Sequence, residues 1–149
     1  MNTRAKQNAL GRPLSGLFFA ILGTILAASG CGDGLPTRVK VAGKVLIDGQ
    51  PLPQGNIKFV PSGGRPSAGK VQPDGSFVLT CYDGNDGVIP GRHRVQISAS
   101  EILGESKVRW HAPKKYADFR TSDLTFEINE PNEDLTIELT WDGGKPFTE

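Results

Sequence analysis

Apolar and polar residues alternate with a period of two along most of the chain after residue 38. In the first such run, 39–47, Val and Ile side chains occupy most of the odd positions, and Gly43 interrupts the pattern. This alternation is typical of a β-strand with one face against a core, and a glycine inside it indicates a bulge or a close backbone approach. The same pattern predicts six further strands, over 56–60, 67–72, 76–80, 92–99, 124–128 and 135–141.

Turn-forming residues separate these runs. Asp48-Gly49 and Pro73-Asp74-Gly75 are strong turn signals, because glycine adopts positive φ readily and proline fixes φ near the value that a turn needs. Seven short strands in about 100 residues, with turns between them, are typical of a β-sandwich.

We therefore predict an all-β sandwich domain over 39–142, with a long irregular segment at 101–122 and a frayed tail at 143–149. In a sandwich the inward-facing positions of both sheets supply the core. The residues predicted to be buried are Val45, Phe59, Phe77, Val95, Ile97, Phe126, Ile137 and Leu139.

The N-terminal segment has a different pattern. Three cations, Arg4, Lys6 and Arg12, precede an uncharged apolar run at 17–28, and no acidic residue occurs before Asp33. A positive segment, a short apolar run and small residues at its end are typical of a secretory signal peptide. The apolar run is shorter than the roughly 20 residues of a spanning helix. We expect residues 1–30 to be a signal peptide.

The last residues of this segment, Ala28-Ser29-Gly30-Cys31, resemble the lipobox of bacterial lipoproteins. The resemblance implies cleavage between Gly30 and Cys31 and attachment of lipid to Cys31. Because two or three acyl chains anchor a protein stably, a lipidated Cys31 needs no transmembrane helix. We expect a lipid-anchored, extracytoplasmic protein with a flexible tether at 31–38. The alternatives are ordinary secretion, with Cys31 incidental, or an uncleaved anchor.

Composition adds little chemistry. Residues 31–149 contain 14 Lys and Arg against 16 Asp and Glu, so the sequence does not suggest the clustered basic face of a nucleic-acid-binding protein. With Cys31 assigned to lipid, Cys81 is left without an intramolecular disulfide partner. We interpret it as a half-buried structural thiol rather than a nucleophile.

Five short phrases of the sequence resemble those of transthyretin-like, carboxypeptidase regulatory-like domains. They read VAGKVLIDGQPLP at 41–53, GNIKFVP at 55–61, DGSFVL at 74–79, GVIPGRHRV at 87–95 and PKKYAD at 113–118. In this order, after a lipobox, they resemble small planctomycete-type lipoproteins with one such domain. The resemblance implies a seven-stranded, prealbumin-like β-sandwich on the outer side of a membrane. It implies a fold and a location rather than a reaction.

Two candidate sites lie near the middle of the chain. His93 follows a Pro-Gly turn on the side of the inward apolar residues, where it either titrates near neutrality or ligates a metal, or makes a structural hydrogen bond to the neighbouring loop. We favour the structural role, because no second His or Cys has ligand spacing. The loop at 83–87 is similar to part of a calcium loop but is one residue short, and we interpret it as a turn cluster.

The most basic and aromatic stretch is 107–116. Arg109, Trp110, Lys114, Lys115 and Tyr116 are its candidate binding residues. On an exposed loop they would hold an anionic polysaccharide or a protein partner by charge and stacking. The alternative is that the two rings pack the loop onto the sandwich while the lysines stay in solvent. We favour packing.

These observations lead to three ranked hypotheses. The first is a non-catalytic interaction or structural module of the cell envelope, with no cofactor, no metal and an unknown envelope protein or polysaccharide as partner. The second is a carbohydrate- or metal-binding module that uses the 107–116 loop or the 83–93 region. The third is a hydrolase, which we consider least supported. The chain ends KPFTE, whereas the transthyretin-related hydroxyisourate hydrolases end in Tyr-Arg-Gly-Ser.

Overall fold

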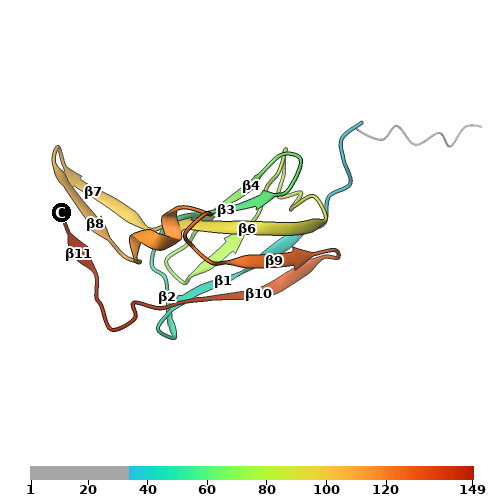
Figure 1. The fold of residues 1–149 in the computed structure, drawn as a ribbon. Coiled ribbons are helices and arrows are strands. Elements are labelled where there is room, and N and C mark those ends of the chain that lie inside the picture. The colour runs from blue at the N-terminus through green and yellow to red at the C-terminus, as the bar shows by residue number, and fades with distance from the viewer. Residues whose placement is uncertain (1–33) are drawn as a thin grey trace, which may run out of the picture. The chain divides into compact units, whose positions relative to one another are not determined.

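The computed structural model describes residues 34–149, so the predicted signal peptide and Cys31 lie outside the described residues. Residues Pro36–Glu149 form one compact unit. This unit is all-β, as the alternation predicted, with one short 3₁₀ helix, η1 (Lys114–Ala117). Figure 1 shows strands arranged in packed layers, with one hairpin projecting beyond them.

The first sheet is built around β1 (Val41–Ile47). On one side β1 pairs in parallel with β10 (Asn132–Leu139), and on the other it pairs antiparallel with β2 (Gln50–Pro51) and β5 (Ser76–Val78). The register between β1 and β10 shifts between Val41 and Gly43, and a Cβ at Gly43 would overlap the carbonyl oxygen of Leu135. The predicted bulge and close backbone approach at Gly43 are confirmed.

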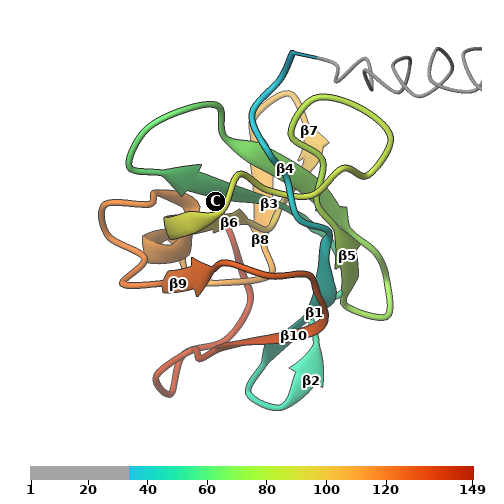
Figure 2. The ribbon, with the colours of Figure 1, turned by 90° about the vertical axis from the view of Figure 1, so that its right-hand side faces the viewer.

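The second sheet is antiparallel throughout. Its strand order is β4 (Ser67–Val71), β3 (Gly55–Pro61), β6 (Gly91–Ser98) and β9 (Thr125–Ile128). Figure 2 shows this sheet facing the first across a narrow space. Each of the seven predicted segments overlaps a strand of these two sheets, but the sheets contain eight strands among the described residues, because β2 was not predicted.

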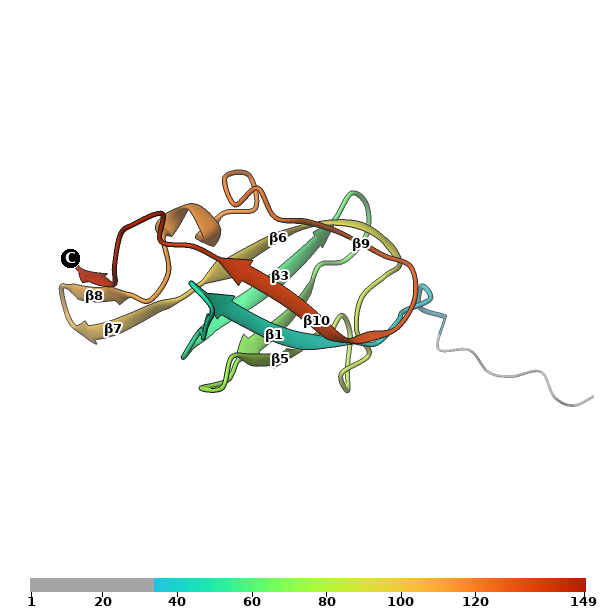
Figure 3. The same ribbon diagram turned by 90° about the horizontal axis from the view of Figure 1, so that it is seen from below.

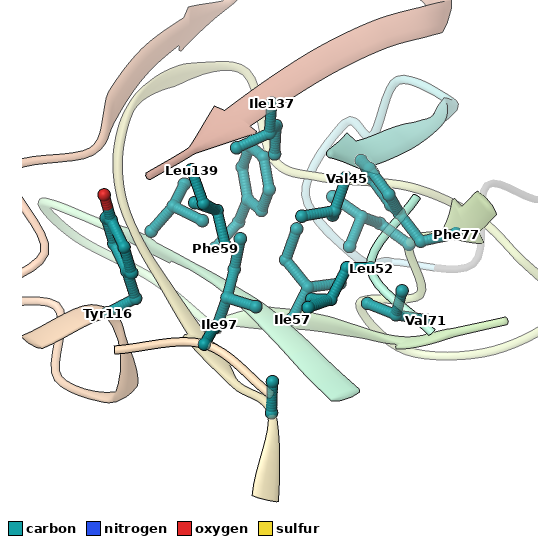
Figure 4. Packing of buried hydrophobic residues seen from close by; sticks show 14 of the residues in the cluster. Val45, Leu52, Ile57, Phe59, Val71, Phe77, Ile97, Tyr116, Ile137 and Leu139 are labelled. Carbon is teal, nitrogen blue, oxygen red and sulfur yellow. The ribbon is translucent and has the colours of Figure 1, made fainter. Parts of the chain in front are cut away.

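The core fills the space between the two sheets. Phe59 and Ile57 from β3 and Ile97 from β6 are buried against Val45 and Ile137 of the first sheet. Figure 4 shows these side chains converging from both layers. Seven of the eight residues predicted to be buried are buried. The prediction was wrong for Phe126, which is only partly buried because it lies on β9, at the edge of its sheet.

Two sequence-based expectations were wrong. The segment 101–122 is not irregular: β7 (Ser100–Gly104) and β8 (Lys107–Trp110) form a hairpin within it, followed by η1. The tail is not frayed, since β11 (Phe147–Thr148) pairs with β8 and completes a third sheet. We call this sheet, β7, β8 and β11, the extension. Figure 3 shows it continuing beyond the end of the sandwich.

Candidate functional site

His93 lies inside the sandwich and not on its surface. Its side chain is fully buried, with its ring 5.7 Å from that of Phe59 between centroids. Nε2 is 2.8 Å from the carbonyl oxygen of Ile89, in the loop before β6, while Nδ1 has no hydrogen-bond partner among the described residues. Burial lowers the pKa of the imidazole, against an opposing effect from the Ile89 carbonyl. The geometry is that of a neutral histidine holding the neighbouring loop.

In the 83–87 loop, which is similar to part of a calcium loop, the carboxylate of Asp86 is already hydrogen-bonded to backbone N–H groups. One carboxylate oxygen of Asp86 accepts hydrogen bonds from the backbone N–H groups of Cys81, at 2.7 Å, and Tyr82, at 3.2 Å, and Arg38 lies 3.1 Å from the other. Although burial opposes ionisation, these contacts hold the pKa of Asp86 below its usual range. The carboxylate thus links the two ends of its own loop through backbone groups four and five residues before it.

The same loop buries Cys81 and places Tyr82 between two cations. The thiol of Cys81 lies 3.6 Å from the carbonyl oxygen of Arg65, whose Nε donates to the carbonyl of Cys81 at 2.7 Å. The guanidinium groups of Arg38 and Arg65 lie 5.4 Å and 5.1 Å from the centre of the Tyr82 ring. Such cation–π contacts stabilise the loop modestly and leave the thiol inside it.

Two of the predicted binding residues in the 107–116 stretch, Trp110 and Lys114, are held by the C-terminal tail. Nε1 of Trp110 donates to Glu149 at 2.9 Å, and Lys114 donates to the same carboxylate at 2.6 Å while lying 5.3 Å above the Trp110 ring. The hydrogen bonds from Lys114 and Trp110 lower the pKa of Glu149. Phe147, directly opposite Trp110 on β11, is edge-on to Trp141.

The remaining members of that stretch have separate surroundings. Lys115 pairs with Asp142 at 2.7 Å, and this hydrogen bond raises the lysine pKa. Tyr116 is buried, and its hydroxyl accepts a hydrogen bond from the backbone N–H of Thr140 at 3.2 Å. Arg109 points to solvent. The five residues therefore do not form one open surface, and His93 does not join them.

The most exposed apolar side chains of the described chain lie on the extension. Ile102 is 80% exposed and Leu103 is 50% exposed, both at the end of β7 near the hairpin turn. The sequence analysis did not identify these two residues as a site. The available signal was an Ile-Leu pair, followed by Gly104, between polar residues. Figures 1 and 3 show the β7–β8 hairpin at one end of the domain and the first described residues, in blue, at the other end.

A scan against protein-family models and searches of curated proteins and of solved structures found no match to this chain. Within residues 34–149, no helix has the length and apolar character needed to cross a membrane.

Proposed function

We propose that this protein is a membrane-anchored, extracytoplasmic lipoprotein whose β-sandwich is a non-catalytic interaction module. The N-terminal pattern supports the location: cations, an apolar run at 17–28, and small residues ending at Cys31. Two or three acyl chains on that cysteine would hold the protein at a bilayer without a spanning helix. The tether, 31–38, would span at most about 28 Å when fully extended.

The observation that carries the proposal is the exposed apolar tip of the extension. Two large aliphatic residues that are consecutive in sequence, Ile102 and Leu103, are 80% and 50% exposed, so much of their apolar surface stays in contact with water in the isolated domain. Large exposed apolar patches mark interaction surfaces, and we propose that these two side chains at the hairpin tip belong to one. The first described residues, in blue, lie at the opposite end of the sandwich. An anchor at Cys31 would join the domain at its N-terminal end, and we propose that the tip at the other end contacts another envelope protein.

We further propose that the sandwich is of the prealbumin-like type. Three phrases of the resemblance coincide with turns or strand starts of the structure, which supports this proposal. Asp48-Gly49 turns β1 into β2, with φ of 77° at the glycine, and Gly75 turns the chain into β5 with φ of 81°. Gly91, with φ of 130°, begins β6 after Pro90. These positive φ angles are conformations that glycine adopts without strain.

The anchor is tested by Cys31→Ser in the full-length protein. Because the thiol is the attachment point, we expect the variant to remain a longer, unacylated precursor. Mass spectrometry of the intact chain and membrane fractionation measure this directly. The absence of any acyl mass on wild-type Cys31 would reject the lipoprotein assignment.

The interaction surface is tested by photo-cross-linking in the intact envelope. A photoreactive residue at Ile102 should give a discrete cross-linked protein adduct, and Leu103→Ser should reduce its yield. The matched control is Val78, which is 46% exposed but lies on the sandwich. If position 78 gives the same adduct as position 102, or neither gives one, the tip is not the binding surface.

A further inference from the structure

The outward face of the second sheet is basic. Strands β3, β4 and β6 alternate buried apolar residues with exposed polar ones, and four of the exposed side chains are cations. They are Lys58, Lys70, Arg92 and Arg94. We call these four residues the basic stripe.

The strand register aligns these cations diagonally across the sheet. Asn56 of β3 lies opposite Lys70 of β4, and Lys58 lies opposite Gln96 of β6. Lys58 is therefore a diagonal neighbour of both Lys70 and Arg94, at the about 7–8 Å that separates such positions. Arg92 follows Arg94 along β6 at about 7 Å. The result is a line of positive charge across three strands.

Most of the positive charge of the basic stripe is not neutralised by ion pairs. Among the described residues, no ion pair includes Lys58, Lys70 or Arg92. One carboxylate, Glu127 of β9, stands opposite Arg92 in the register without an ion pair between them.

Arg94 lies near an aromatic ring and a carboxylate. Its guanidinium lies 4.6 Å from the centre of the Phe119 ring, which restricts the side chain. The neighbouring Asp118 is bonded to Arg120, and that contact, with a smaller effect of Arg94, lowers the pKa of Asp118 to about 2. The carboxylate of Asp118 is thus paired with Arg120 rather than with Arg94.

The outward face of the first sheet has the opposite character. Its edge strand β10 presents Glu133, Asp134 and Glu138 to solvent, while β1 presents Lys44. The sandwich is therefore polarised, with cations concentrated over β3, β4 and β6. A charge separation of this kind orients an incoming polyanion toward one face.

We propose that the basic stripe binds a linear acidic polysaccharide laid diagonally across β4, β3 and β6. A line of cations matches a polymer that carries carboxylates at regular intervals, because several of its carboxylates can meet positive side chains at once. The amides of Asn56 and Gln96 lie beside the line and offer hydrogen bonds to sugar hydroxyls. The choice of a cell-surface polymer rests on the proposed extracytoplasmic location.

Two other polyanion partners fit less well. Single-stranded nucleic acid needs a series of aromatic platforms for its bases, whereas β3, β4 and β6 present none on this outer face and Phe119, beside Arg94, is a single ring. An anionic bilayer is engaged best by cations combined with inserted apolar side chains, whereas the exposed Ile102 and Leu103 lie on the extension. Both alternatives become outcomes of the test.

The experiment measures binding of the full-length protein, in neutral detergent, to immobilised polygalacturonate, a linear polyuronate. We expect saturable binding that weakens at least about tenfold between 0.05 M and 0.5 M salt, because exposed charges are screened. The double variant Lys58→Glu/Arg94→Glu should weaken binding at least about tenfold at low salt. The milder Lys58→Gln/Arg94→Gln should show the same direction, and thermal melts of both establish that they fold.

The matched control is Lys40→Glu/Lys44→Glu, which makes the same change in net charge on and beside β1. It should weaken binding less than about threefold. Equal losses in the two double variants, or no binding by the wild type, would overturn the proposal. Stripe-dependent binding to phosphatidylglycerol vesicles or to oligonucleotides, without binding to polygalacturonate, would also overturn it. A missing acyl group on Cys31 would reject only the proposed anchor, since this measurement uses no membrane.

Discussion

The sandwich and the extension are stabilised in different ways. Phe59 and Phe77 of the sandwich are buried between two sheets, and its stability comes from apolar surface removed from water. The extension encloses no such core: Trp110 is half-buried, under Lys114 and beside Glu149. Exposed ion pairs of that kind contribute little to stability. The sandwich therefore supplies most of the stability of the fold, while the extension is an ordered projection that adds little to it.

This difference changes how an apolar side chain is interpreted in each region. A buried Phe59 needs no explanation beyond packing, because burial of such a ring is worth about 1.5–3 kcal/mol. Ile102 gains almost nothing of that kind at 80% exposure. Its position is better explained by contact with something outside the domain, and for this reason the proposed interaction surface lies there.

The largest expected effect is that of emptying the core. Phe59→Ala or Phe77→Ala should lower the free energy of unfolding by about 3–5 kcal/mol, since each removes a buried ring and leaves a cavity. Ile102→Ala, the counterpart in the extension, should change it by less than about 0.5 kcal/mol. Urea denaturation of the three variants measures the contrast. Losses below about 1 kcal/mol at both phenylalanines would mean that the sandwich core is wrongly assigned.

A second comparison uses two glycines. Alanine at Gly43 would place a Cβ against the carbonyl oxygen of Leu135, so β1 and β10 must separate, and we expect a loss of about 1–3 kcal/mol. Alanine at Gly104, in the extension, would meet no atom within 4 Å. There we expect a change of about 0.5 kcal/mol or less. Thermal melts of the two variants check this, and a harmless Gly43→Ala would argue against the close β1–β10 pairing.

The sandwich was predictable because its information is local. Alternation at 39–47 or 92–99 assigns each side chain to a face without knowledge of the partner strand. Gly43 was likewise identified from its position within one strand. The period of two also puts Arg92 and Arg94 on one face, but the register with β3 is needed to align them with Lys58.

The extension was not predictable, because its strands depend on contacts between residues that are far apart in the sequence. Adjacent Ile102 and Leu103 break the alternation, so β7 has no strand signal of its own. The two residues of β11 form a strand only because β8 is beside them, and Glu149 meets Trp110 across 39 positions of sequence. A local sequence pattern cannot predict such a contact. The surroundings of the predicted binding residues therefore became visible only in the structure.

A third prediction concerns the junction between the two regions. Trp110→Ala should lower the free energy of unfolding by about 1–2 kcal/mol, less than a core phenylalanine, because the ring is only half-buried. Glu149→Gln, which leaves the ring in place and removes the charge that faces Lys114, should cost less than about 1 kcal/mol. Chemical denaturation distinguishes the two. A loss at Trp110 as large as that at Phe59 would show that the extension has a core of its own.

The smallest expected effect separates the two histidines by pH. Burial lowers the pKa of His93 in the folded protein below the value of about 6.5 that it has in the unfolded chain. Between these two values the unfolded chain binds a proton that the folded protein does not, so stability falls as pH drops through about 6.5 and levels off below the folded-state pKa. Nδ1 has no partner in the described domain to offset that proton. The free energy of unfolding should therefore decrease from about pH 7.5 to about pH 5, and His93→Gln should flatten this slope whatever its effect on absolute stability.

His111→Gln is the matched control, because His111 lies at the base of the extension, 3.1 Å from the Glu101 carboxylate. If His111→Gln removes the slope and His93→Gln leaves it, the acid-sensitive group belongs to the extension and not to the core.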